Sequence, residues 1–127
     1  MMQELIQHLQ ASGLFTGYAF TGWRDDAAYP FKDSIPVCLI RIQGGRQDRD
    51  IGAPGADIYL HSPMNATSSQ RGALLATAAQ LDRYLTTATV FANVQHIEMP
   101  TSAAGPYKDG QNRYFTAHRI TIRRSGV

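Results

Sequence analysis

The chain has 127 residues, enough to bury one hydrophobic core and too few for two, so we expect a single domain spanning residues 1–127. With 12 Lys and Arg against 10 Asp and Glu, the net charge is only +2, which excludes the dense positive field of a dedicated nucleic-acid binder but not local contact with a polyanion. The one cysteine, Cys38, excludes an intramolecular disulfide. Polar residues interrupt the first segment, and no apolar run approaches ~20 residues, so we expect a soluble, cytoplasmic protein without membrane contact.

A short amphipathic helix is predicted at the start of the chain. Apolar residues such as Leu5 and Leu9 recur at helical spacing, and Gly13 stands where a left-handed C-terminal cap is expected. The next segment, LFTGYAF at 14–20, is aromatic and interrupted by glycine, which suggests a short strand or an extended arm. We expect a loop over 21–34 after it.

Two strands follow, with a charged loop between them. The first is IPVCLIRIQ at 35–43, which is β-branched and apolar, and the second is GADIYLHS at 55–62. Both alternate with a period of two, which is typical of a sheet covered on one side. The segment at 44–55 begins with two glycines and carries charges of both signs, so it predicts a solvated loop at the hairpin tip.

The main helix is predicted over 67–87. Thr67 and Gln70 have the spacing of a capping box. Apolar residues then form a stripe at helical spacing, namely Leu74, Ala78, Leu81 and Leu85. Such a stripe needs an apolar partner, and the apolar face of the sheet is the available one.

The last part of the chain predicts an edge strand and a long closing strand. The segment NVQHIEM at 93–99 suits a short edge strand, and a loop over 100–113 leads into the closing strand, which begins at Tyr114. Alternation sorts the strand residues into an inward set, Ile40, Ile42, Ile58, Leu60, Ile120 and Ile122, and an outward set, Arg41, Asp57, His61, Arg119 and Arg123. The predicted fold is therefore α+β, a mainly antiparallel sheet of about four strands with two helices packed on one face.

Residues that could act in catalysis or bind a cofactor do not have the spacing of a known catalytic or metal-binding motif. The four histidines, His8, His61, His96 and His118, lack the spacing of zinc sites. Cys38 lies within an apolar strand, where burial shields a thiol, and no serine stands in a strained nucleophile elbow. We therefore predict no metal, no cofactor and no enzymatic activity.

Two alternatives remain open from the residues alone. The first is a small nucleic-acid-binding domain whose arginine and aromatic sheet face would bind phosphates and stack on bases. Its residues would be Arg113, Arg119, Arg123, Tyr114 and Phe115. The second is an enzyme built on three residues predicted to share one sheet face, His61, His118 and Asp57.

The order of elements resembles the tail terminator, or tail completion, proteins of long-tailed bacteriophages. The resemblance rests on the QELIQHLQASG helix, PFKDSIPVCLIRIQGG ahead of a charged hairpin, ADIYLHSP leading into the ALLATAAQLDRYL helix, and the closing GPYKDGQNRYFTAHRITIR. It covers almost the whole chain as a pattern, without an invariant motif. It implies a small α+β subunit that assembles as a ring, commonly hexameric, on the last layer of the tail tube, stops polymerisation of the tube and offers a surface for joining the head.

This resemblance also implies partners and a place in the cell. The expected partners are further copies of the chain, the tail tube protein and a head-completion protein, with possible passing contact with DNA. The expected location is the cytoplasm of the bacterial host and the virion of a functional phage. Because a cyclic assembly joins two different surfaces of each subunit, the mixed-sign loop of one copy is predicted to meet the outward sheet face of its neighbour. The predicted contact residues are Arg46, Asp48, Arg49 and Asp50 in the loop and Arg41, Asp57, Arg119 and Arg123 on the sheet.

Overall fold

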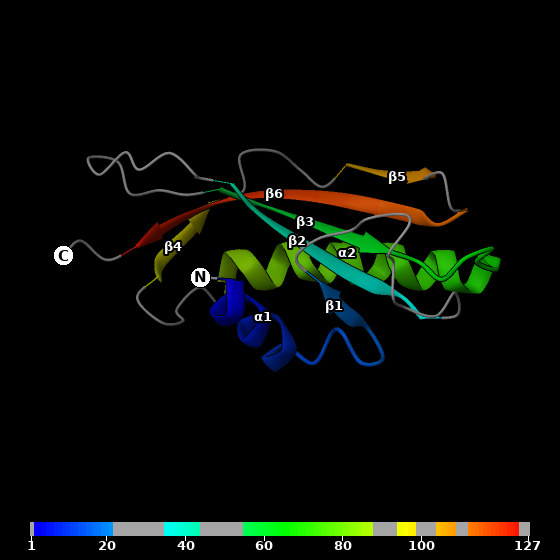
Figure 1. Cartoon of the computed structure of the whole chain (residues 1–127), viewed down its shortest axis with the longest axis horizontal. Coiled ribbons are helices and arrows are strands. Elements are labelled where there is room, and N and C mark those ends of the chain that lie inside the picture. The colour runs from blue at the N-terminus through cyan, green and yellow to red at the C-terminus, as the bar shows by residue number, and fades with distance from the viewer. Residues whose placement is uncertain are drawn as a thin grey trace.

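The computed structural model describes residues 2–21, 35–43, 55–87, 94–98, 104–108 and 112–124. Its elements, in chain order, are α1 (Met2–Ala11), β1 (Ala19–Thr21), β2 (Val37–Gln43), β3 (Gly55–His61), α2 (Ser68–Thr87), β4 (Val94–Glu98), β5 (Ala104–Lys108) and β6 (Tyr114–Arg124). Both helices lie on the same side of one sheet (Figure 1). The α+β class and the placement of the two helices on one face are therefore confirmed.

The sheet contains six described strands, more than the predicted four. Five follow the order β1-β2-β3-β6-β4, and β5 also pairs with β6. Strand β1 runs parallel to β2, whereas every other pairing is antiparallel. Strands β4 and β5 pair with different ends of β6, at residues 121–124 and 114–117.

Strand β5 corrects the prediction of a loop over 100–113. Its glycine and proline suggested irregular backbone, but both are tolerated at a sheet edge, where the ladder is interrupted. The register between β5 and β6 shifts between Ala104 and Tyr107, and Gly105 within that shift has a φ of 114°. An added Cβ at Gly105 would lie 2.8 Å from the carbonyl oxygen of Phe115, so the close approach of the two strands requires glycine there.

The C-terminal end of α1 and the N-terminal end of α2 have the capping residues that the sequence predicts. At α1, Gly13 has the left-handed φ of 76° expected for a cap residue. At α2, the backbone N–H of Gln70 donates a hydrogen bond to Thr67 Oγ1 at 3.2 Å, and the backbone N–H of Thr67 donates to Gln70 Oε1 at 2.9 Å. This reciprocal pair is the predicted capping box, and it fixes where the long helix begins.

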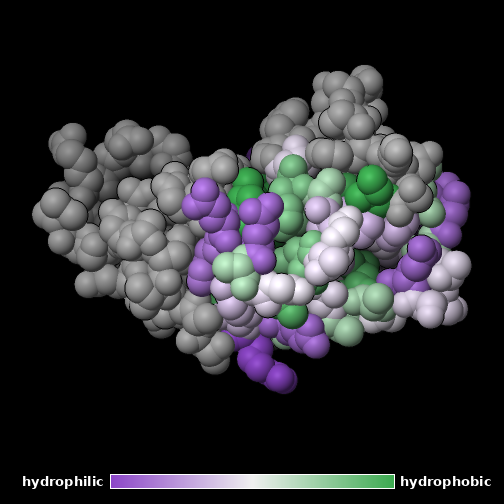
Figure 2. All heavy atoms as spheres, turned by 90° about the horizontal axis from the view of Figure 1, so that it is seen from below, coloured by the Kyte–Doolittle hydropathy of each residue, from purple (hydrophilic) through white to green (hydrophobic). Residues whose placement is uncertain are grey.

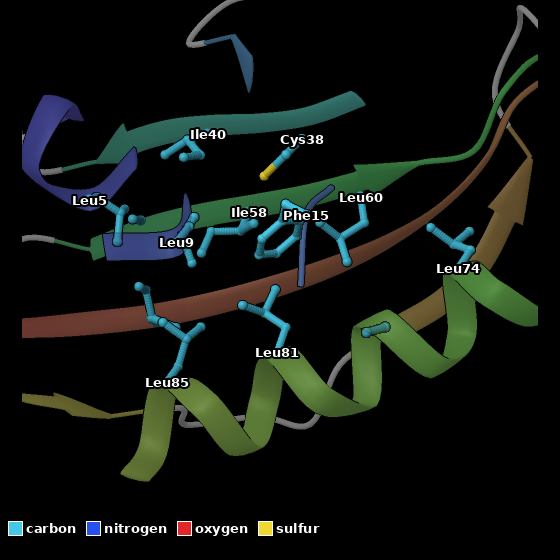
Figure 3. Close-up of a cluster of buried hydrophobic side chains, with 13 residues drawn as sticks. Leu5, Leu9, Phe15, Cys38, Ile40, Ile58, Leu60, Leu74, Leu81 and Leu85 are labelled. Atoms are coloured by element: carbon cyan, nitrogen blue, oxygen red, sulfur yellow. The ribbon is translucent and has the colours of Figure 1, made fainter. Parts of the chain in front are cut away.

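The hydrophobic core fills the space between the helices and the sheet (Figure 3). The stripe of α2, Leu74, Ala78, Leu81 and Leu85, is buried there with Leu5 and Leu9 of α1 and with Cys38, Ile40, Ala56, Ile58, Leu60 and Ile120 of the sheet. Burial of each large aliphatic side chain contributes about 1.5–3 kcal/mol, so this layer sets the orientation of the strands. The inward prediction is confirmed for Ile40, Ile58, Leu60 and Ile120, whereas the side chains of Ile42 and Ile122 lie outside the described residues.

The helix-bearing side has a mixed surface. Viewed from that side, hydrophobic residues lie in the middle of the described surface, and hydrophilic residues surround them (Figure 2). Neither described helix has the combination of length and apolarity that a membrane-crossing helix needs.

Candidate interaction site on the outer sheet face

The sheet face opposite the helices, here called the outer face, presents its side chains in rows across neighbouring strands. Residues opposite each other in an antiparallel pair share a face, so the register defines each row. One row is Arg41, Asp57 and Arg119, which we call the arginine row. Two rows further along is the aromatic row, formed by His61, Phe115 and Tyr107. Tyr59 lies between the two rows, beside Ala117.

The arginine row contains an ion pair at its centre. Arg119 donates a hydrogen bond from Nε to Asp57 Oδ1 at 2.9 Å, and this bond raises the pKa of the guanidinium. The Asp57 side chain is 5% exposed and that of Arg119 is 64% exposed. Arg41 is exposed on the other side of Asp57, directly across the β2–β3 ladder. Two guanidinium groups around one buried carboxylate leave a local net positive charge that faces solvent.

The aromatic row is a contiguous set of ring contacts that runs from the buried His61 to the exposed Tyr107 at the β5 edge. The Phe115 ring lies 5.2 Å from the His61 ring in a stacked arrangement and 5.5 Å from the Tyr107 ring, and it contacts Tyr59 edge-on at 6.3 Å. Contacts of this kind are favourable beyond the area they bury. Tyr107 is 50% exposed, so the row ends in a large side chain that solvent reaches.

The structure brings together part of the predicted contact set. Arg41, Asp57 and Arg119 share one row, as alternation predicted, although Asp57 is buried beneath its partner instead of projecting freely. Arg123 belongs to β6 opposite His96, and its side chain lies outside the described residues. The four loop residues Arg46, Asp48, Arg49 and Asp50 also lie outside the described residues.

The burial of Arg113 contradicts the prediction that it is a surface contact for nucleic acid. It is 0% exposed, and its Nη1 donates to the carbonyl oxygens of Ile35 and Ser62, both at 2.9 Å. Arg113 has the same parity as Arg119, so extending the alternation backwards would place it on the outer face. The strand begins only at Tyr114, however, and Asn112 has a left-handed φ of 57°, so the chain turns before alternation applies.

Tyr114 is also wrongly assigned to the nucleic-acid face. It packs against the core on the helix side. The Arg71 guanidinium lies 5.2 Å and the Lys108 ammonium 5.9 Å from the centroid of its ring. These cation–π contacts hold the start of α2 and the end of β5 beside β6. Of the two aromatic residues named above for base stacking, Phe115 lies on the outer face and Tyr114 does not.

The predicted enzymatic set, His61, His118 and Asp57, is not assembled. His118 pairs with Ile58 across the β3–β6 ladder and therefore faces the helices, whereas Asp57 and His61 face outward. The predicted common face was wrong because His118 and the buried Ile120 are two residues apart on β6, so their side chains lie on the same side of the sheet. On the helix side, His118 Nδ1 lies 2.7 Å from Asp82 Oδ1, and its Nε2 lies 3.0 Å from Thr116 Oγ1.

The Asp82, His118 and Thr116 cluster has the connectivity of a hydrolytic triad but not its accessibility. Thr116 is 2% exposed and His118 1% exposed, so a substrate cannot approach the hydroxyl. Burial lowers the pKa of His118, and the hydrogen bond to Asp82 only partly opposes this effect. The cluster ties α2 to β6 within the core. Sequence reasoning missed it because Asp82 stands beside the apolar stripe of α2 without any local motif.

The thiol of Cys38 is equally enclosed. Cys38 is buried in the core, which raises the pKa of its thiol and keeps it from reacting as a thiolate. Within the described ranges, no group of three or more His, Cys, Asp or Glu residues could hold a metal ion. The outer face is therefore the surface on which we base a function.

Comparison with known proteins adds no family to this geometry. No protein-family model matches the chain, and a search of curated proteins found no relative.

Proposed function

We propose that the chain is a structural protein of a phage or prophage that forms a ring on the tail tube, ends tube polymerisation and provides the surface for head joining. The resemblance in element order is the starting point for this proposal. The observation that carries it is the outer face, where two exposed arginines and an exposed tyrosine lie on a sheet whose opposite face is covered by both helices. A subunit that works by contact needs such a surface and needs no active site.

The chemistry of the outer face suits a contact between subunits. A ring is built from a head-to-tail interface, so each subunit offers one surface to the preceding copy and a different one to the next. The outer face would be one of these surfaces, with the charged sequence segment at 44–55, most of which lies outside the described residues, as the second. Arginine and tyrosine are enriched in protein interfaces because they combine apolar contact area with hydrogen bonding.

The proposal is tested by adding the purified chain to polymerising tail tube protein of the same phage or prophage. We expect electron micrographs to show tubes that stop growing and carry an extra ring of density at one end. Tubes of unchanged length with bare ends, at a chain concentration equal to that of tube protein, would refute the proposal. A chain denatured before addition serves as the control for nonspecific effects.

A second candidate function is nucleic-acid binding by the outer face. The observation in its favour is that Tyr107, half exposed and packed on Phe115, lies on the same face as Arg119. The burial of Arg113 and the inward position of Tyr114 remove two of the five residues first considered for it. Titration of single- and double-stranded oligonucleotides at two salt concentrations tests it, because phosphate contacts weaken steeply with salt. Absence of binding at low salt would eliminate it.

A further inference from the structure

Asp57 holds the Arg119 side chain in place through only one of its N–H groups. Asp57 accepts the hydrogen bond from Nε, and no hydrogen bond within the described part of the chain involves the two Nη atoms. A guanidinium has five N–H donors in a planar fork, so four of them remain for another molecule. The 64% exposure of this side chain means that solvent, or a partner, reaches them.

Asp57 restricts the freedom that a surface arginine normally has. A free arginine loses rotamer entropy when a partner immobilises it, and this loss weakens binding. Because the Asp57 carboxylate is itself fixed in the central strand β3 and is 5% exposed, the guanidinium that it holds is oriented before any partner arrives. Arg41, across the ladder from Asp57, makes no ion pair with a described residue and adds a second cation to the row.

We propose that Arg119, oriented by Asp57 and assisted by Arg41, binds a carboxylate of a second copy of this chain. The proposal rests on the ring-forming function stated above and gives its interface a defined chemistry. Arg119 makes the contact, and Asp57 is a positioning residue. A carboxylate fits the arginine fork through two parallel hydrogen bonds, which supply direction as well as attraction.

Charge complementarity favours a second copy as the occupant. The chain carries 10 acidic residues against 12 basic ones, yet Asp57 is the one acidic residue among the described side chains of the outer face, and it is buried. The described part of the outer face is thus cationic within a nearly neutral molecule, and we infer that a different surface of a second copy supplies the carboxylates. A polyanion fits less well, because the two exposed arginines of the row offer few of the many phosphate contacts on which polyanion binding depends.

The aromatic row supplies an apolar contact at a defined separation from the carboxylate site. Phe115 and Arg119 are four residues apart on β6, which corresponds to about 13 Å along a strand at ~3.3 Å per residue. The exposed Tyr107 beside Phe115 extends this apolar area to the sheet edge. The facing surface of the second copy therefore needs an acidic group and an apolar group at this spacing.

The test compares self-association of purified full-length variants by sedimentation velocity over a range of concentrations. We expect the native chain to assemble and Arg119→Gln to lower its association constant at least tenfold. Arg119→Lys should fall nearly as far, because an ammonium keeps the charge but lacks the fork. Asp57→Asn should weaken association by a smaller factor. Arg83→Gln is the matched control, because it removes one positive charge from an exposed position on α2, and it should stay within twofold of the native chain.

Three outcomes overturn the inference. They are a native chain that stays monomeric at every concentration, an Arg119→Gln variant that associates as well as the Arg83→Gln control, and an Arg119→Lys variant that matches the native chain. Thermal denaturation of each variant shows whether a lost association reflects a lost fold. An Asp57→Asn variant whose melting temperature falls while its association constant is unchanged would reduce Asp57 to a stabilising residue and remove its positioning role.

Failure of this inference is separable from failure of the tail function. If tubes are still capped by Arg119→Gln, the chain terminates tails through another surface, and only the carboxylate site is lost. If association depends on Arg119 but tubes are never capped, the site stands and the tail function is lost. Loss of oligonucleotide binding by Arg119→Gln with unchanged self-association would instead overturn the site and favour the nucleic-acid function.

Discussion

Replacement of Arg113 by methionine should strongly destabilise the fold. The guanidinium donates from Nη1 to the carbonyl oxygens of Ile35 and Ser62, both at 2.9 Å, and so joins the approach to β2, the segment after β3 and the start of β6. Methionine leaves both carbonyls without this donor, at about 1–3 kcal/mol for each unsatisfied group. Removing a buried charge recovers part of that loss. We therefore expect the free energy of unfolding to fall by about 2–4 kcal/mol, a large part of the ~5–15 kcal/mol that stabilises a domain.

Equilibrium unfolding in urea at neutral pH measures this loss. Gln80→Met provides the control, because Gln80 is exposed on α2 and such surface substitutions usually change stability by less than ~0.5 kcal/mol. Arg113→Lys should recover little, because a single ammonium group cannot reproduce the planar geometry of the guanidinium. A loss for Arg113→Met no larger than that of the control would show that the two carbonyl contacts do not hold these strands together, and our explanation of the buried arginine would be wrong.

Three further predictions test the core, the sheet edge and the buried histidine. Leu81→Ala should lower the free energy of unfolding by about 2–5 kcal/mol in urea titrations, because it empties a fully buried site, whereas Leu75→Ala, at a 44% exposed position of the same helix, should cost less than ~0.5 kcal/mol. Equal losses would contradict the assigned helix orientation. Gly105→Ala should lower the thermal midpoint, because a Cβ there would clash with the β6 backbone and φ is 114°, whereas Gly72→Ala, with open space in a helix, should raise stability by about 0.5–1 kcal/mol. A rise for both would refute the close approach of β5. The pKa of His118 is below its unfolded value of 6.5, so the unfolded chain takes up a proton first and stability should fall as pH drops below about 6.5. Unfolding titrations between about pH 7.5 and 5.5 should show a flatter pH dependence for His118→Asn than for the native chain, and identical slopes would contradict burial of the neutral ring.

Local periodicity was enough to predict the central layers. The stripe from Leu74 to Leu85 and the alternation around Ile40, Ile58 and Ile120 both report burial directly, because hydrophobic side chains must leave water whatever the connections between elements are. The capping residues Thr67 and Gln70 act on the backbone of their own helix, so their role is also readable locally. These features predicted both helices and the faces that β2, β3 and β6 bury.

Contacts made across the fold were not readable in the same way. Asp82 meets His118 from 36 residues away, and Arg113 reaches carbonyls 51 and 78 residues away. Neither pairing leaves a periodic trace in the sequence. Strand β5 was missed because glycine and proline indicate a loop unless the neighbouring strand is known. The arginine row was predicted as a group, yet the burial of Asp57 beneath Arg119 required the register between β3 and β6.

The position of the arginine row within the sheet bears on how a partner would be held. Its residues come from β2, β3 and β6, neighbouring strands whose other faces are packed on the core. A contact built on such strands keeps its geometry before binding, so most of the binding energy is available to resist dissociation. Charges at the rim of an interface mainly change the rate of association, whereas loss of a buried, hydrogen-bonded charge pair mainly shortens the lifetime of the complex. In the proposed ring, which would have to outlast assembly of a whole particle, lifetime is the property that matters. If the chain forms the proposed rings, removal of the Arg119 fork should therefore appear chiefly as faster subunit exchange between them, with the rate of ring formation changed much less.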